Sequence, residues 1–317
     1  MNQRILFLGT PDFAVATLNA MVTAGLEVCA VVTAPDRPAG RGRQIRGSAV
    51  KERALELGLP VLQPEKLKDP AFLAELDRFD AALYVVVAFR MLPETVWARP
   101  ALGTVNLHGS LLPAYRGAAP INWAVINGEE RTGVTTFRLR HEIDTGDLLL
   151  QESTPIGTNE TAGDVHDRLM LIGAGLMVRT VQGLFAGTIH ATPQHIDPAC
   201  PPPLAPKLNN ANMHVGFDRQ AKAIHDHVRG LSPHPGARCT WTDGAGHPQD
   251  LKLLRTAITD RPARYACGTM YAEAERLYVC CTDRALEIIE LQAEGRKRML
   301  AAEFLRGTRH LAGSRLS

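Results

Sequence analysis

The sequence predicts an α/β protein with a mostly parallel sheet, followed by a small, separate β-rich domain. Three observations lead to this fold class. Short β-branched runs alternate with helical stretches through the first half of the chain. A proline-rich segment interrupts this pattern at residues 189–206, and short strands separated by turns follow it. The β-α-β-α order of the first half implies parallel strands with right-handed crossovers.

The elements of the first half follow from the spacing of their apolar residues. The stretch 80–88 is apolar along its length, as expected for a strand covered on both faces. Gly25 ends the first helix, and Pro93 suits a first helical turn. We expect strands at 4–10, 28–34, 60–64, 80–88 and 103–109, and helices at 13–25, 48–58, 69–79, 92–100 and 118–128.

The pattern changes after residue 130. Strands at 133–140 and 147–157 are separated only by a short turn, so we expect them to pair antiparallel. A long helix over 162–187 then closes the first domain. Its longest continuous apolar run, 170–178, is too short to span a bilayer.

The proline-rich segment predicts a boundary between two domains. The first domain is expected at 1–188, a linker at 189–206 and the second domain at 207–317. In the second domain, a helix follows Asp218, which is a suitable N-cap. Five short strands with little further helix indicate a small barrel or sandwich; they are expected at 237–242, 250–258, 268–274, 276–282 and 285–292.

Composition sets limits on the kind of protein. The chain has 317 residues, 45% of them hydrophobic, and a formal net charge of only +2. Residues 1–206 carry 18 basic and 21 acidic groups, whereas 207–317 carry 17 and 12. The mild basic excess of the second part can attract a polyanion, although it is weak evidence alone.

Cysteine usage and the N-terminus indicate a cytoplasmic protein. The six cysteines show no C-x-x-C spacing, which suggests neither a disulfide framework nor a zinc site. The chain enters a strand at once, with no signal or transit segment ahead of it.

Polar residues gather where the predicted parallel strands end, which is where open α/β sheets bind their ligands. Asn106 and His108 lie two residues apart at one strand end, so their side chains leave the same face. Asp144, in the turn before residue 147, is the carboxylate expected to lie beside His108. An Asn amide and an imidazolium can both donate to an oxyanion on an attacked carbonyl. The alternative is that His108 and Asn106 are ordinary structural residues at a strand end.

This trio suggests direct acyl transfer rather than covalent catalysis, because no Ser or Cys nucleophile accompanies it. No metal is needed. The segment "GTPDF" at residues 9–13 lacks the G-x-G-x-x-G pattern, so it is poor evidence for a nicotinamide cofactor.

A long basic loop leaves the same edge of the sheet. Residues 36–51 hold three glycines and the basic side chains Arg37, Arg41, Arg43, Arg46 and Lys51. A flexible basic loop beside a reactive centre suits a substrate that carries phosphodiesters. The alternative is a solvated loop with no ligand.

Several blocks together resemble the methionyl-tRNA formyltransferase family of folate-dependent enzymes. They occur in the family's order and cover nearly the whole chain. They are "NLHGSLLPAYRGAAP" (106–120), "GTPDFA" (9–14), "PDRPAGRG" (35–42), "IDTGD" (143–147), "RGLSPHPGA" (229–237) and "GRKRMLAAEFLRG" (295–307). The resemblance implies a Rossmann-like formyltransferase domain followed by a small OB-like β-barrel that also contacts tRNA.

The resemblance implies formyl transfer from 10-formyltetrahydrofolate to methionyl initiator tRNA, by a monomer and without a metal or membrane. It implies catalytic roles for Asn106, His108 and Asp144. The folate site would comprise Ser110, Leu111, Leu112, Pro113, Phe89, Arg90 and Met91, together with the backbone of 141–145. The tRNA site would comprise Arg37, Arg41, Arg43, Arg46 and Lys207, with Arg41 the key loop residue.

Departures from the family include two beside the expected folate pocket, where the family usually has glycine and this chain has Arg90 and Glu142. Two other kinds of protein remain to be considered. One is another folate-dependent formyltransferase or a formyltetrahydrofolate hydrolase, which would share the catalytic core. The other is a non-catalytic tRNA-binding protein, which would have no need for the trio.

Overall fold

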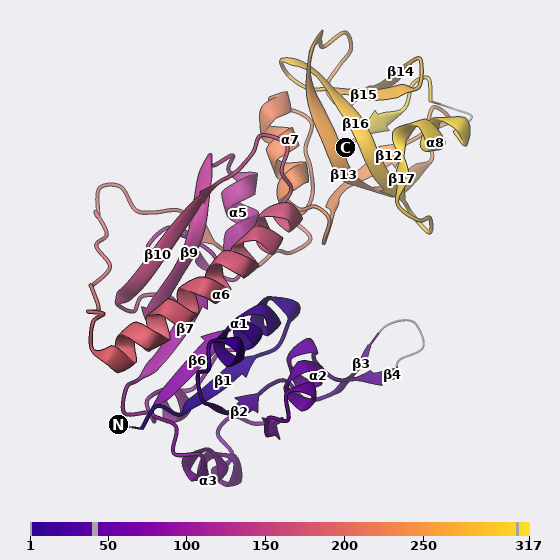
Figure 1. Ribbon diagram of the computed structural model, residues 1–317. Helices are drawn as coiled ribbons and strands as arrows, with labels where there is room; N and C mark the ends of the chain where they lie inside the picture. The colour runs from indigo at the N-terminus through magenta and orange to yellow at the C-terminus, as the bar shows by residue number, and fades with distance from the viewer. Residues whose placement is uncertain (1, 40–43, 309–310) are drawn as a thin grey trace. The chain divides into compact units, whose positions relative to one another are not determined.

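The computed structural model describes residues 2–39, 44–308 and 311–317. By their contacts, these residues form two compact units, each of which is assembled from three stretches of chain (Figure 1). The first unit comprises Met1–Gly117, Gly133–Thr154 and Asp167–Leu204. The second comprises Ala118–Thr132, Pro155–His166 and Ala205–Ser317. Two segments of the N-terminal part of the sequence therefore contribute to the second unit.

The first unit contains the predicted α/β sheet. Seven strands lie in the order β10-β9-β7-β6-β1-β2-β5. All the neighbouring pairs from β7 to β5 are parallel, and β9 joins β7 antiparallel. The strands are β1 (Ile5–Gly9), β2 (Val28–Val32), β5 (Val61–Leu62), β6 (Leu83–Val87), β7 (Thr104–His108), β9 (Arg131–Arg138) and β10 (Leu148–Pro155). The prediction of a mostly parallel sheet is confirmed.

Helices connect these strands. They are α1 (Asp12–Thr23), α2 (Ala49–Glu56), α3 (Pro70–Arg78), α4 (Glu94–Trp97) and α6 (Ala162–Ala186). The Ser48 hydroxyl accepts the backbone N–H of Lys51 and so caps α2, while Asp69 caps α3 through the N–H of Ala71. Apolar side chains of α3 and the central strands, among them Leu6, Val86 and Leu76, form a buried core.

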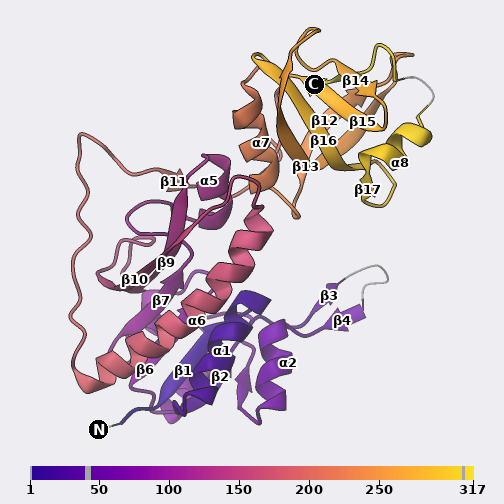
Figure 2. The same cartoon turned by 45° about the horizontal axis from the view of Figure 1, so that its top comes forward.

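The long helix α6 runs along the sheet in both views (Figures 1 and 2). A Cβ atom on its Gly173 would lie 2.8 Å from a methyl carbon of Leu107 on β7, so the glycine allows close packing. Its Thr180 hydroxyl also lies 2.8 Å from that of Thr136 on β9. By length and composition alone, α6 is the one helix among the described residues that could cross a membrane. Its close packing against β7 and β9 is that of a core helix of this sheet.

The basic loop is a short antiparallel hairpin at its base, β3 (Arg37–Ala39) and β4 (Gln44–Arg46) (Figure 2). Arg37 pairs in register with Arg46. The base is held by Asp36, whose carboxylate accepts from Lys51 and, at 2.7 Å, from Gln63. Arg41 and Arg43 lie outside the described residues.

The second unit is built on a curled antiparallel sheet in the order β14-β15-β16-β13-β12-β18, consistent with the predicted OB-like fold. Its elements are α5 (Pro120–Ile126), α7 (Ala221–Gly230), β12 (Ala237–Thr242), β13 (Pro248–Pro262), β14 (Met270–Glu273), β15 (Arg276–Cys280), β16 (Arg284–Ala293), β17 (Met299–Leu300), α8 (Ala301–Arg306) and β18 (Arg315–Leu316). Trp241, Leu253 and Leu291 are among the side chains of its core.

The predicted cap of the helix after residue 218 is wrong. The helix α7 begins at Ala221, with Gln220 at the N-cap and no cap from its own side chain. Asp283, from the turn between β15 and β16, instead accepts the N–H of Ala221 at 2.8 Å. A carboxylate distant in sequence thus accepts one of the backbone N–H groups that have no partner within the first turn of the helix.

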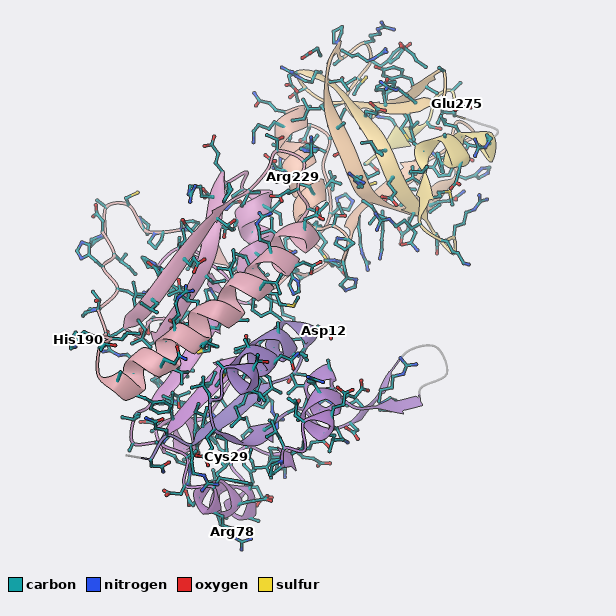
Figure 3. The ribbon with its side chains drawn as sticks, viewed as in Figure 1. Asp12, Cys29, Arg78, His190, Arg229 and Glu275 are labelled. Atoms are coloured by element: carbon teal, nitrogen blue, oxygen red, sulfur yellow. The ribbon has the colours of Figure 1, made fainter. Side chains whose placement is uncertain are left out.

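The inserted segments of the second unit pack on α7. The Asn122 amide of α5 donates to Gly230 O at 2.8 Å, and Gly230 leaves room for Ile126. Arg229, labelled in Figure 3, donates to Asp226 at 2.7 Å and to the carbonyl oxygens of Gly157 and Glu160. The predicted linker therefore does not separate the two units on its own, because residues 118–132 and 155–166 also belong to the second.

Candidate active site

The end of β7 carries Asn106 and His108, as expected from their spacing. Asn106 is half-buried, with Val86 of β6 on one side and Phe137 of β9 on the other. Its amide has no hydrogen-bond partner among the described residues of the chain. The amide is therefore available to a ligand at the carboxyl edge of the sheet.

His108 is buried, with 6% of its surface exposed. Its Nε2 lies 2.8 Å from the carbonyl oxygen of Tyr115, which can only accept, so Nε2 carries a hydrogen. Its Nδ1 lies 3.7 Å from Oδ2 of Asp144. The ring also meets Phe137 edge-on, with the ring centroids 6.4 Å apart. Both ring nitrogens therefore face oxygen atoms, Tyr115 O at hydrogen-bond distance from Nε2 and the Asp144 carboxylate 3.7 Å from Nδ1.

Asp144 is brought to His108 by a tight turn between β9 and β10. Its backbone has a φ of 54°, the left-handed region that Asp tolerates better than most residues. Its Oδ2 atom accepts the N–H of Gly117 at 2.9 Å. Gly146 completes the turn, because a Cβ there would lie 1.6 Å from Arg138 O. The structure thus brings together all three residues of the predicted trio.

A glutamine that the sequence reasoning missed also contacts this turn. Gln194 lies in the segment predicted to be a linker. Its Nε2 donates to the carbonyl oxygens of Asp144, at 2.9 Å, and Gly146, at 2.7 Å. Its Oε1 accepts from Arg116, with the nearer nitrogen at 2.5 Å. No local signal marks it, since a polar residue among prolines is typical of any linker.

The segment after His108 is fixed by a buried network. The Thr135 hydroxyl donates to Ser110 O at 2.6 Å and accepts the N–H of Leu112 at 3.1 Å. Gln151 donates to Leu112 O at 2.9 Å. The Ser110 hydroxyl donates to Ala114 O at 2.6 Å, and the Leu112 side chain is buried. The side chains of Ser110 and Leu112 are thus used in contacts within the protein, whereas Leu111 and Pro113 are half-buried.

The other predicted folate residues follow β6. Phe89 packs on the core of the first unit, and Met91 is exposed. Arg90 donates to the carbonyl oxygens of Pro64 and, at 3.0 Å, Glu65. Partial burial lowers the pKa of Arg90, and the positive charge of Arg37 lowers it further. The base of the basic hairpin therefore lies within electrostatic reach of this loop.

The predicted tRNA residues that are described, Arg37, Arg46 and Lys207, are all exposed. Arg37 and Arg46 face one another across the hairpin base, and Lys207 follows β11 (Leu204–Ala205). No group of three or more His, Cys, Asp or Glu side chains suited to a metal ion occurs within residues 2–39, 44–308 and 311–317.

Comparison with known proteins gives a consistent result along the chain. Residues 3–181 match the family model described as formyl transferase, and residues 207–309 match that of the formyl transferase C-terminal domain. The methionyl-tRNA formyltransferase of Parabacteroides distasonis is 47% identical over 314 residues, 98% of this chain and 97% of that protein. That of Bacteroides thetaiotaomicron is 44% identical over 317 residues, 99% and 98% of the two chains.

Solved structures share the fold at low identity. The crystal structure of WlaRD, a sugar 3N-formyl transferase, matches with a TM-score of 0.64 and 17% identity, covering 94% of this chain and all of that one. HypX from Aquifex aeolicus in complex with tetrahydrofolic acid matches with a TM-score of 0.64 and 17% identity over 96% of this chain and 47% of that one. From its two matching family models and its close full-length relatives, the chain belongs to the formyl transferase family.

Proposed function

We propose that this protein transfers the formyl group of 10-formyltetrahydrofolate to the α-amino group of methionyl initiator tRNA, giving formylmethionyl-tRNA for translation initiation. The observation that carries the proposal is the Asn106, His108 and Asp144 constellation at the sheet edge, within a chain 44–47% identical over its whole length to methionyl-tRNA formyltransferases. We assign residues 1–188 to the catalytic domain, 189–206 to the linker and 207–317 to the tRNA-binding domain, on which residues 118–132 and 155–166 of the first part also pack.

The chemistry follows from the donors at the end of β7. The neutral methionyl amine attacks the formyl carbon, and this form is accessible because an α-amino group has a pKa of about 7.7–8.0. The bond between the formyl carbon and N10 of the folate then breaks, and the proton lost by the amine goes to N10, so that tetrahydrofolate leaves. The free Asn106 amide donates to the oxygen on which negative charge develops. His108 supplies a second donor, because its Nε2–H can turn from the Tyr115 carbonyl to that oxygen. Asp144 lies beside Nδ1 and orients the ring.

The folate co-substrate would lie along residues 110–113, with Phe89, Arg90, Met91 and the turn at 141–145 on its other side. Thr135 and Gln151 fix the 110–113 backbone, so this wall of the site is rigid before the ligand binds. The chemistry needs no metal.

The tRNA partner would be held through its phosphates. Arg37 and Arg46 stand at the base of the hairpin. Arg41 and Arg43, which lie between them in the sequence and outside the described residues, belong to the same proposed set. Lys207 adds a charge where the second domain begins. The protein would work as a cytoplasmic monomer away from membranes. The packing of α6 against its own sheet supports only the last of these points.

The test is a formylation assay with 10-formyltetrahydrofolate and methionine-charged initiator tRNA. Uncharged tRNA, charged elongator tRNA and the Asn106→Ala variant are the controls. The proposal requires formyl-methionine only with the charged initiator, and its loss in the variant. Consumption of folate at the same rate without tRNA would instead identify a hydrolase, and tRNA binding without any formylation would identify a binding protein.

A further inference from the structure

The turn that carries Asp144 is clamped by a side chain from a distant part of the chain. Thr192 forms an isolated antiparallel bridge with Leu148 at the start of β10, through bonds of 2.8 and 2.9 Å. Because the bridge is antiparallel, the residue two positions after Thr192, Gln194, lies opposite the residue two positions before Leu148, Gly146. The side-chain amide of Gln194 then spans the turn by donating to both Asp144 O and Gly146 O. One amide therefore fixes the two carbonyl groups on either side of Thr145.

The same glutamine is held from its other end by Arg116. Both Nε and Nη2 of Arg116 donate to Oε1 of Gln194, at 3.1 and 2.5 Å. Partial burial lowers the pKa of Arg116, while the nearby carboxylates of Asp144 and Glu142 raise it. A fork of two donors onto one amide oxygen leaves Gln194 a single orientation, with its NH₂ group toward the turn.

These contacts close a ring around the Asp144 carboxylate. Arg116 and Gly117 form the short strand β8, and Gly117 N donates to Asp144 Oδ2. The contacts therefore run from the Asp144 carboxylate to Gly117 and its neighbour Arg116. From Arg116 they continue to Gln194 and return to the backbone of Asp144. The carboxylate is thereby held at Oδ2 by Gly117 N, and the Asp144 backbone is held by Gln194. A left-handed backbone at Asp144, which costs about 1 kcal/mol or more, is maintained by such fixed neighbours.

We infer that Gln194 and Arg116 are positioning residues, which act through Asp144 to hold its carboxylate at the 3.7 Å observed from His108. This inference rests on the proposed function, because it assigns to Asp144 the task of orienting the histidine. It also gives the predicted linker a second role, since its residue 194 completes the site. Misplacement of a catalytic group by about 1 Å can cost about 100-fold in rate.

The first test compares kinetic constants of two variants with the wild type. Gln194→Ala removes both halves of the clamp. Gln194→Glu keeps an acceptor for Arg116 but replaces the NH₂ donor that faces the two carbonyls. Both should lower kcat between about 10-fold and 100-fold, with KM for folate and for tRNA changed less than threefold. His195→Ala, in the adjacent exposed position, is the matched control and should retain wild-type constants.

A double-mutant cycle distinguishes positioning from general support of the fold. In an Asp144→Asn background, Gln194→Ala should lower kcat by less than twofold, because the group through which it acts is already lost. Equal losses in both backgrounds would overturn the inference, as would wild-type kcat in Gln194→Glu. Equal thermal unfolding midpoints of Gln194→Ala and the wild type would show that the loss of rate is not unfolding. A wild-type protein that formylates nothing would refute the proposed function instead.

Discussion

At the scale of single residues, the site separates into groups that contact substrate and groups that hold them. Asn106 has a free amide, so it can donate to the reacting carbonyl at no cost to the fold. His108 has Tyr115 O at 2.8 Å from Nε2 and the Asp144 carboxylate 3.7 Å from Nδ1. Its orientation is therefore set before substrate arrives, which is the condition for electrostatic stabilisation of a transition state.

Replacing Asn106 by Ala should lower kcat by about 100-fold to 1,000-fold, because one oxyanion donor is worth that much in related chemistry. The unfolding midpoint should stay at the wild-type value, since the amide has no partner among the described residues. Steady-state formylation kinetics and thermal unfolding of the same preparation measure the two quantities. A fall in stability that accounted for the lost rate would make Asn106 structural.

The loop after β6 gives a second test at this scale. Arg90→Gly restores the residue usual in the family and removes bonds to the carbonyl oxygens of Pro64 and Glu65. We expect KM for 10-formyltetrahydrofolate to change severalfold while kcat stays within a factor of two, because Arg90 borders the proposed folate wall and not the trio. Glu142→Gly, in the turn near Asp144, is the companion variant. An unchanged KM in Arg90→Gly would place Arg90 outside the folate site.

At the scale of elements, α7 organises the second unit. It is covered by α5 and by residues 155–166, and it carries a buried ion pair between Arg229 and Asp226 at 2.7 Å. Lys222 contacts the same carboxylate from the surface. His225 donates from Nε2 to Thr158 O and accepts at Nδ1 from Thr256, whereas His227 donates to Asn212 O and accepts from Arg219. Both histidines are thus bonded as neutral rings.

Asp226 pairs with two cations, and removing the buried one should lower the free energy of unfolding more than removing the exposed one. Arg229→Ala leaves the Asp226 carboxylate buried without its arginine and should destabilise the second unit by about 3–5 kcal/mol. Lys222→Ala removes a mostly exposed partner and should cost about 0.2–1 kcal/mol. Urea unfolding followed by circular dichroism compares the two. Equal losses of unfolding free energy in the two variants would mean that the buried ion pair contributes no more to stability than the exposed one.

The two buried histidines predict a pH dependence of stability. Burial lowers the pKa of both His225 and His227 below the usual value of 6.5. Above pH 6.5 they are neutral whether the chain is folded or unfolded; as the pH falls below it, the unfolded chain binds protons that the folded one does not. Stability should therefore fall on acidification below about pH 6.5, by up to about 1.4 kcal/mol per pH unit for each histidine.

The measurement is urea unfolding at pH 7.5 and at pH 5.5. In the double variant His225→Gln and His227→Gln, the difference between the two pH values should shrink. His190→Gln, at an exposed histidine (Figure 3), should leave the difference unchanged. A double variant with the full wild-type difference would assign the acid sensitivity to other groups.

At the scale of the whole molecule, the chain has nearly balanced charge, so any affinity for tRNA must come from local groups. The net charge is only +2, yet Arg37 and Arg46 stand together at the hairpin base and the C-terminal part has its own basic excess. Side chains of this kind fix a nucleic acid by its phosphates and release counterions.

Affinity for tRNA should therefore fall steeply with salt. Each phosphate that the protein no longer neutralises should reduce the slope of log K against log salt by about 0.7–0.9. We expect the double variant Arg37→Ala and Arg46→Ala to reduce the slope by up to about 1.8 if each arginine neutralises one phosphate. Filter binding across a salt series measures this. Arg53→Ala, which removes a basic residue bonded to Glu56 on α2, should keep the wild-type slope.

Much of this architecture follows from local patterns in the sequence. The alternation of strands and helices, the apolar strand at Leu83–Val87 and the shared face of Asn106 and His108 depend on spacing along a short stretch. So does the second unit's series of turn-separated strands. The N-cap of α7 could not be predicted in this way, because Asp283 reaches it from a distant turn.

Local sequence patterns carry the fold class, the family motifs and the residue types of the site. Long-range packing supplies the distant groups that complete them: Asp144 beside His108, Gln194 across the turn, and α5 with residues 155–166 on α7. The reason is physical. Period and turn chemistry are properties of neighbouring residues, whereas a 3.7 Å approach between residues 108 and 144 depends on how the whole chain closes around its cores.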